Sequence, residues 1–250
     1  MEDGTKRHHR HEEGLSTFFG QSSFGTYTVV NERNVVKVDK DVGLALLGPL
    51  GCGIQTGSGA VLNRLKPEVG SSIAVYGAGA VGLSAIMAAK AINCGTIIAV
   101  DVHDNRLELA KEVGATHVIN ARNVNPVEEI KRITGSGVNY AVEAAGRQGI
   151  LRQALDSLTF CGKVVQIGAP PLGTEEKIDT NDLLLFNKTI TGVLEGDSIP
   201  RIFIPQLIKM YKEGKFPFDK IVEFYHFEEI NQAVEDSHNG KTVKAIIKMG

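Results

Sequence analysis

A glycine turn, Gly77–Gly82 (GAGAVG), constrains this 250-residue chain more than any other feature. It follows a short apolar segment at 72–76, typical of a buried strand, and opens an apolar segment at 80–92, typical of a helix. Glycines in this context allow a tight turn, close approach of a pyrophosphate and close packing of the helix on the sheet. The N–H groups at the start of the helix and its dipole favour phosphate. The turn therefore predicts a dinucleotide-binding site at Gly77, Gly79, Ala80, Val81 and Gly82.

An acidic residue supports this reading. Asp101 ends the next predicted strand, 96–101, and lies 19 residues beyond Gly82. A carboxylate there can hydrogen-bond the hydroxyls of an adenosine ribose and repels a 2′-phosphate, so we expect NAD rather than NADP. Arg106 either reaches the same ribose or faces water. The alternative for the turn itself is that its glycines serve packing alone.

Segments typical of strands and helices alternate from residue 71 to residue 194. This alternation predicts an α/β fold with a doubly wound parallel sheet. The expected strands cover residues 72–76, 96–101, 117–120, 139–144, 163–167 and 189–194, and the expected helices cover 80–92, 104–113, 126–134 and 148–158. Outside this region we expect two short strands within 26–38, helices at 200–213 and 227–237, and a last strand at 243–248.

Composition excludes several classes of protein. The net charge is −2, with 27 basic and 29 acidic residues, which argues against a polybasic nucleic-acid binder. The cysteines Cys52, Cys94 and Cys161 are too widely spaced for a CxxC metal pair or a disulfide framework. The first residues contain no apolar signal segment, and the uncharged stretches 42–63 and 69–89 are interrupted by glycines. We therefore expect a cytoplasmic protein without a membrane segment.

Other nucleotide-binding folds fit less well. A short-chain dehydrogenase uses a Tyr-x-x-x-Lys motif after the fourth strand, and the match here, Tyr211–Lys215, comes far too late. A methyltransferase usually has a Gly-x-Gly-x-Gly turn, which this sequence lacks. No Walker phosphate loop is present.

Four blocks of sequence resemble the zinc-type medium-chain alcohol dehydrogenases, and in particular their aryl (benzyl) alcohol dehydrogenase branch. The blocks occur in the order of the family and fall at residues 48–61 (GPLGCGIQTGSGAV), 72–90 (SIAVYGAGAVGLSAIMAAK), 97–120 and 196–221. The resemblance covers residues 20 to 250. It implies a Rossmann domain for NAD at 54–194, inserted in a GroES-like, β-rich catalytic domain of which 1–53 and 195–250 are remnants.

The resemblance also implies site residues. Cys52 matches a ligand of the catalytic zinc, and Thr56 matches a position beside the nicotinamide. A buried, inert thiol is the alternative for Cys52. Lys244 matches a basic residue that reaches the pyrophosphate, or else it is a solvated lysine at a strand end. Further cofactor-binding residues are expected at Ala144, Ile167, Gly168 and Ala169, and Glu143 lies at the same end of its strand.

The implied activity is oxidation of primary aromatic alcohols to aldehydes by hydride transfer to NAD, with zinc polarising the alcohol. The family's other zinc ligands have no counterpart in this sequence, so we expect a truncated member with an incomplete zinc site and weak turnover. The alternatives are a non-catalytic NAD-binding module and an inactive fragment. The expected partners are a small alcohol or aldehyde and a second copy of the chain, joined through the sheet edge near 188–194.

Overall fold

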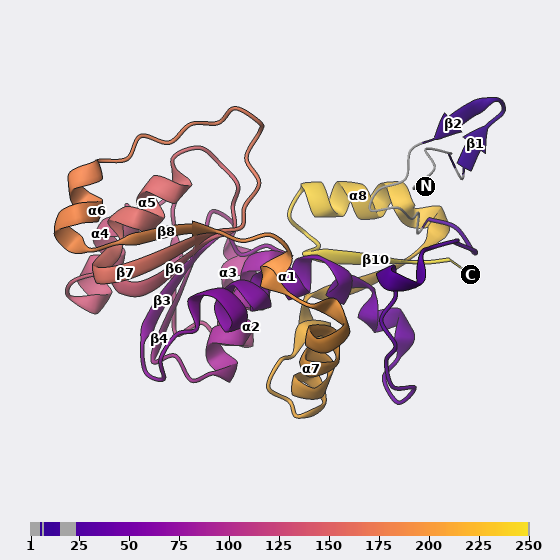
Figure 1. Cartoon of the computed structure of the whole chain (residues 1–250), viewed down its shortest axis with the longest axis horizontal. Coiled ribbons are helices and arrows are strands. Elements are labelled where there is room, and N and C mark those ends of the chain that lie inside the picture. Colours follow the sequence, from indigo (N-terminus) through magenta and orange to yellow (C-terminus); the bar gives the residue numbers. More distant parts are fainter. Residues whose placement is uncertain (1–5, 7, 16–23, 250) are drawn as a thin grey trace.

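The computed structural model describes residues 6, 8–15 and 24–249 of the chain. Its central feature is a six-stranded sheet of order β5-β4-β3-β6-β7-β8, in which every neighbouring pair is parallel (Figure 1). This order confirms the predicted doubly wound sheet. The strands are β3 (Ser72–Tyr76), β4 (Thr96–Asp101), β5 (His117–Asn120), β6 (Val138–Glu143), β7 (Leu158–Gln166) and β8 (Thr189–Gly192).

Helices cover both faces of this sheet because successive side chains of a strand point to opposite faces. In β3, Ile73 and Val75 pack with one group of helices, whereas Ala74 and Tyr76 pack with the other. The first group is α2 (Ala80–Ala91) and α3 (Asp104–Val113), and the second is α4 (Pro126–Thr134) and α5 (Ile150–Asp156).

The helix ends follow from local sequence. Asn125 caps α4, since its side chain accepts hydrogen bonds from the N–H groups of Val127 and Glu128, and Pro126 occupies the first turn. Gly135 follows the helix with a φ of +81°, a conformation that favours glycine. These signals explain why this helix lies where the sequence predicts it.

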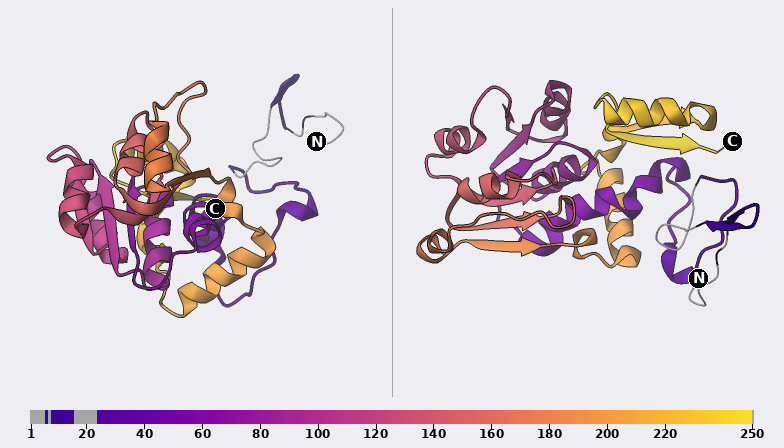
Figure 2. Two further views of the ribbon diagram at one scale, coloured as in Figure 1. Left: turned by 60° about the vertical axis from the view of Figure 1, so that its left-hand side comes forward. Right: turned by 90° about the horizontal axis from the view of Figure 1, so that it is seen from above.

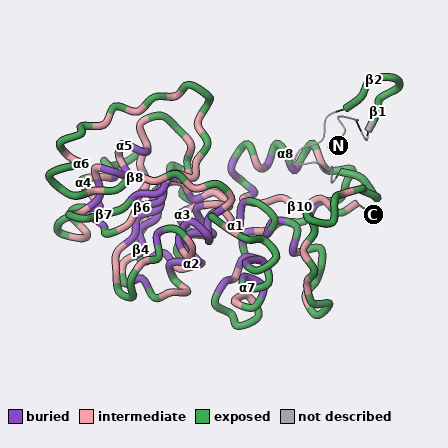
Figure 3. The backbone as a smooth tube through the Cα atoms, viewed as in Figure 1, coloured by how far each residue is buried: buried purple, intermediate pink, exposed green. Residues whose placement is uncertain are grey.

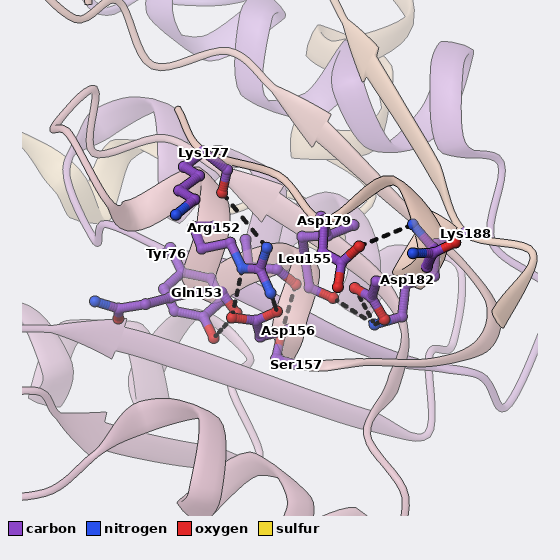
Figure 4. A network of polar contacts seen from close by, with 12 residues as sticks. Tyr76, Arg152, Gln153, Leu155, Asp156, Ser157, Lys177, Asp179, Asp182 and Lys188 are labelled. Carbon is purple, nitrogen blue, oxygen red and sulfur yellow. Dashed lines mark hydrogen bonds and ion pairs between the residues drawn. The ribbon is translucent and has the colours of Figure 1, made fainter. Parts of the chain in front are cut away.

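One of the two edges of the sheet is formed by β8, which is preceded by α6 (Thr180–Phe186). The ammonium group of Lys188 donates to both carboxylate oxygens of Asp182 at 3.2 Å and to the carbonyl of Leu155 at 3.1 Å. Figure 4 shows these groups turned toward one another, beside the ion pair of Arg152 with Asp156. Lys188 thus joins the edge strand to α5 and α6.

The C-terminal part forms a separate small layer. β9 (Val222–His226) and β10 (Lys244–Lys248) are parallel, and α8 (Ile230–His238) connects them, as two views show (Figures 1 and 2). α7 (Pro200–Lys212) packs its apolar side chains into the main core. The predicted helices and last strand of this region are confirmed, whereas β9 was not foreseen.

A further helix, α1 (Gly53–Gly59), continues through a π-helical stretch at Ala60–Leu65 and was not predicted. Its glycines suggest turns, yet Gly57 serves packing. A Cβ at Gly57 would lie 1.9 Å from the carbonyl oxygen of Val81, so only glycine lets α1 approach the start of α2 this closely. The core residues of both helices are buried (Figure 3).

The two strands expected within 26–38 are wrong. Residues 24–38 hold a 3-10 turn at Glu32–Asn34 and no strand. The side chain of Asn31 accepts from the N–H of Arg33, which favours the turn. Tyr27 is 92% and Val29 71% exposed, so the first part of this segment has little apolar contact to order it as a sheet. A hairpin of β1 (His8–Arg10) and β2 (Glu13–Leu15) precedes it.

Within the described ranges, no helix combines the length and the apolar character needed to cross a bilayer.

Candidate functional site

The glycine turn is tightly packed at two of its glycines and open at the third. Gly77 has a φ of +97°, and a Cβ on Gly82 would lie 1.7 Å from the carbonyl oxygen of Gly77. Packing therefore requires these two glycines. At Gly79, by contrast, a Cβ would meet no atom within 4 Å. Gly79 thus leaves open space at the N-terminus of α2, where Ala80 and Val81 are half-buried.

Asp101 ends β4 beside this turn and is 8% exposed. Its carboxylate accepts hydrogen bonds from three backbone N–H groups, those of Ala78 at 2.6 Å, Val102 at 2.7 Å and His103 at 2.9 Å. The carboxylate is therefore held firmly at the carboxyl end of the strand. A charge-assisted network of this kind fixes the turn as well as the acid.

Arg106 lies on α3, next to the C-terminal layer. Its Nε atom is buried and has no hydrogen-bond partner among the described residues. One Nη atom lies 3.5 Å from the position that a Cβ on Gly240 would take, and Asn105 donates to the Gly240 carbonyl at 2.7 Å. Arg106 is thus half-buried rather than fully solvated. A buried donor without a partner is costly and is available to a ligand.

On the other side of β3, Glu143 joins two loops. It is 1% exposed, and its carboxylate accepts from the N–H groups of Ala145 at 2.8 Å and Gly146 at 2.7 Å. Its carbonyl oxygen accepts from the N–H groups of Ile167 and Gly168, both at 2.9 Å. Burial raises the pKa of Glu143, and the two backbone hydrogen bonds partly oppose this.

These contacts place the expected wall residues at the carboxyl ends of β6 and β7. Ala144 and Ile167 are half-buried and Ala169 is exposed. A cavity of about 230 Å³ opens beside them and is lined by Glu143, Arg147 and Glu176, among others. Open α/β sheets bind ligands in the crevice outside the carboxyl ends of their strands.

Cys52 caps α1 and is exposed, so the alternative of a buried, inert thiol does not hold. Its Sγ donates to the Oε1 atom of Glu195 at 3.8 Å. Partial burial and the charge of Glu195 raise the pKa of Cys52, while the charge of Lys244 lowers it. Lys244 begins β10 and is half-buried, so the C-terminal layer brings a cation to this end of α1.

Glu195 was missed by the sequence reasoning, although it directly precedes the block matched at 196–221. Its Oε2 atom accepts from Gln55 at 3.1 Å and from Thr56 at 3.4 Å. Glu195 has a φ of +50°, which is uncommon outside glycine. Strain of this kind often marks a functional site.

Gly196, the residue after Glu195, holds this turn against α1. A Cβ on Gly196 would lie 2.3 Å from the carbonyl oxygen of Gln55, and Asn63 donates to the carbonyl of Gly196 at 2.9 Å. Arg64 and Asp197 form an ion pair at 2.5 Å. Cys52, Thr56 and the loop after β8 therefore form one unit.

This unit contains potential metal ligands. A catalytic zinc usually takes three protein ligands. Among the described residues, no three His, Cys, Asp or Glu side chains lie close enough to hold a metal together. Cys52 and Glu195 are the two potential ligands that this unit brings together.

Comparison with known proteins defines the class. The family of zinc-binding dehydrogenases matches residues 80–213, which is more than half of the chain. The chain therefore belongs to the zinc-binding dehydrogenase family.

Individual relatives agree. The chain is 38% identical over 233 residues to the geraniol dehydrogenase of Castellaniella defragrans, covering 93% of this chain and 62% of that protein. Its structure is similar to that of benzyl alcohol dehydrogenase from Acinetobacter calcoaceticus, with a TM-score of 0.92, 57% identity, and coverage of 93% of this chain and 64% of that one. An alcohol dehydrogenase zinc-binding domain protein from Burkholderia ambifaria gives a TM-score of 0.91 at 52% identity, covering 93% of this chain and 63% of that one. The chain thus spans less than two thirds of the length of these relatives.

Proposed function

We propose that this chain binds NAD and belongs to an alcohol dehydrogenase that oxidises primary aromatic alcohols to aldehydes. The observation that carries the proposal is the open space at Gly79, at the N-terminus of a buried helix and beside the carboxylate of Asp101. The identity of 57% to a benzyl alcohol dehydrogenase supports the substrate class.

The residues fit the cofactor in its extended form. The pyrophosphate would lie against the N–H groups at Gly79, Ala80 and Val81, where the helix dipole favours anions. Asp101 would accept from the adenosine ribose, and the buried Nε of Arg106 would gain a partner there. The nicotinamide half would lie along Ala144, Ile167, Gly168 and Ala169, with Thr56 beside it and Lys244 toward the pyrophosphate.

The chemistry divides between cofactor and chain. Bound NAD supplies the acceptor for a hydride from the alcohol carbon. The chain's residues would orient the cofactor, and α1 packs closely against the start of α2 at Gly57, beside the glycine turn. Because the described residues bring only Cys52 and Glu195 together as ligands, we propose that this chain alone has weak or no turnover.

We also propose that residues 54–194 form the cofactor domain, and that 1–53 and 195–250 belong to the catalytic domain. A non-catalytic NAD-binding module is the second candidate, and the two-ligand grouping at Cys52 favours it. The experiment that separates them measures zinc content and benzyl alcohol oxidation with NAD on one purified sample. Stoichiometric zinc with turnover supports the enzyme. NAD binding without zinc or turnover supports the module, and failure to bind NAD contradicts both.

We propose, in addition, a homo-oligomer joined through β8, because this strand pairs on one side only and follows the exposed side chains Leu184 and Leu185. Light scattering tests it, and a monomer at micromolar concentration would contradict it. A cytoplasmic location fits the free thiols Cys52, Cys94 and Cys161, and cell fractionation tests it.

A further inference from the structure

Glu195 lies at the carboxyl ends of the strands, on the side of β3 opposite to Asp101. Asp101 ends β4, on one side of β3, whereas Glu195 follows β8, on the other side. In a doubly wound sheet the two halves of a dinucleotide lie on the two sides of the switch point. If the adenosine lies at Asp101, the nicotinamide lies at the carboxyl ends of β6, β7 and β8. Glu195 lies at that end.

The carboxylate is fixed in place rather than free to swing into water. Gln55 and Thr56 donate to one of its oxygens and Cys52 donates to the other. The close contact of Gly196 with α1 holds the backbone of this turn. A fixed charge costs no reorganisation when a ligand arrives.

The surrounding charges leave this carboxylate effective. The neighbouring acid, Asp197, is paired with Arg64 and so is neutralised locally. The charge of Lys244 lowers the pKa of Cys52, whereas the charge of Glu195 raises it. The groups that contact the carboxylate from α1 are a thiol, an amide and a hydroxyl, none of which neutralises it.

We propose that Glu195 determines which redox form of the cofactor this chain prefers, by favouring the oxidised nicotinamide. The oxidised ring carries a positive charge and the reduced ring carries none, so a fixed carboxylate nearby stabilises the oxidised form selectively. The proposal rests on the NAD binding proposed above. It assigns to Glu195 a role in the preference for the oxidised over the reduced cofactor, and this role does not require zinc.

The test compares dissociation constants rather than turnover. NAD⁺ binding is measured by calorimetry and NADH binding by fluorescence, on the whole chain and on Glu195→Gln, which keeps the size of the side chain. We expect the variant to weaken NAD⁺ binding relative to NADH by roughly tenfold. Glu129→Gln removes a half-buried acid on α4 that pairs with Arg132, and it should leave the ratio unchanged.

A second pair of variants guards against a folding defect. Glu195→Asn is also neutral and tolerates a positive φ, so it should change the ratio as Glu195→Gln does. Glu195→Asp keeps the charge and should keep most of the preference. If neither nucleotide binds the unaltered chain, the proposed function fails. Thermal melting checks that both neutral variants are folded. If both nucleotides bind and neither folded neutral variant changes the ratio, the proposal for Glu195 is overturned while NAD binding stands.

Discussion

The backbone N–H of Ala78 donates to the carboxylate of Asp101 at 2.6 Å, which ties the glycine turn to the end of the neighbouring strand. Val102 and His103 donate to the other carboxylate oxygen. The acid that we propose to bind the ribose is therefore also part of the framework that shapes the pyrophosphate loop. Changes at Asp101 should affect both stability and cofactor choice.

Asp101→Asn should lower the free energy of unfolding by about 2 kcal/mol, because the amide nitrogen cannot accept a hydrogen bond in place of a carboxylate oxygen and the remaining bonds are no longer charge-assisted. It should also narrow the preference for NAD over NADP, since a neutral amide no longer repels a 2′-phosphate. Denaturant unfolding and titration with both nucleotides check these effects. An unchanged NAD-to-NADP ratio in a folded variant would rule out ribose recognition by Asp101.

Substitutions at two glycines of the turn should distinguish an effect on packing from an effect on cofactor binding. Gly82→Ala should destabilise the chain by about 3 kcal/mol, because the new Cβ would meet the carbonyl of Gly77. Gly79→Ala should cost about 1 kcal/mol or less, since its Cβ meets no atom within 4 Å. It should nevertheless weaken NAD binding by about tenfold or more, as the Cβ enters the space a pyrophosphate would occupy. Equal binding by Gly79→Ala and the unaltered chain would contradict this.

Lys188→Met should lower the free energy of unfolding by about 3 kcal/mol. The side chain of Lys188 is 5% exposed, and its loss leaves the carboxylate of Asp182 without its cation (Figure 4). Lys209 provides a matched control, since its side chain is 76% exposed in a long contact with Glu213. Lys209→Met should change stability by about 0.5 kcal/mol or less. Urea unfolding measures both, and equal effects would disprove a special role for Lys188.

Asp236 should contribute to stability in acid. Hydrogen bonds from Lys241 and Gln232 lower its pKa below the ordinary value of 3.8. A carboxyl group with a lowered pKa in the folded chain stabilises it above its unfolded pKa, and this stability is lost as the pH falls through the folded value. Asp236→Asn should therefore lose less stability than the unaltered chain as the pH falls below about 4. Glu235→Gln on the exposed side of α8 is the control, and parallel pH curves for Asp236→Asn and the unaltered chain would refute the prediction.

The sheet and its helices were predictable because their signals are local. Apolar segments of strand length alternate with helices whose ends carry caps, such as Asn125 before α4 and Gly114 after α3. The pairing order then follows from the general topology of such sheets. Asp101 and Arg106 were proposed for the same reason, since α2 and β4 separate the glycine turn from Asp101, and Arg106 follows in the first turn of α3.

The remaining features depend on contacts between distant segments. α1 was missed because its glycines read as turns, whereas Gly57 serves the packing of α1 on Val81. Glu195 was missed because its meaning arises only when the loop after β8 meets Cys52. The strands expected near Tyr27 were wrong because alternating β-branched residues predict a strand only where another strand can pair with it. Local pattern alone contains none of this information.

A calorimetric titration of the purified chain with NAD, repeated with Gly79→Ala, tests the proposed cofactor site most directly. We expect saturable binding of about one NAD per chain and a loss of about tenfold or more in affinity for the variant, with both proteins folded. Absence of NAD binding by the folded, unaltered chain, or equal affinity of the two proteins, would contradict the assignment of the glycine turn as the cofactor site.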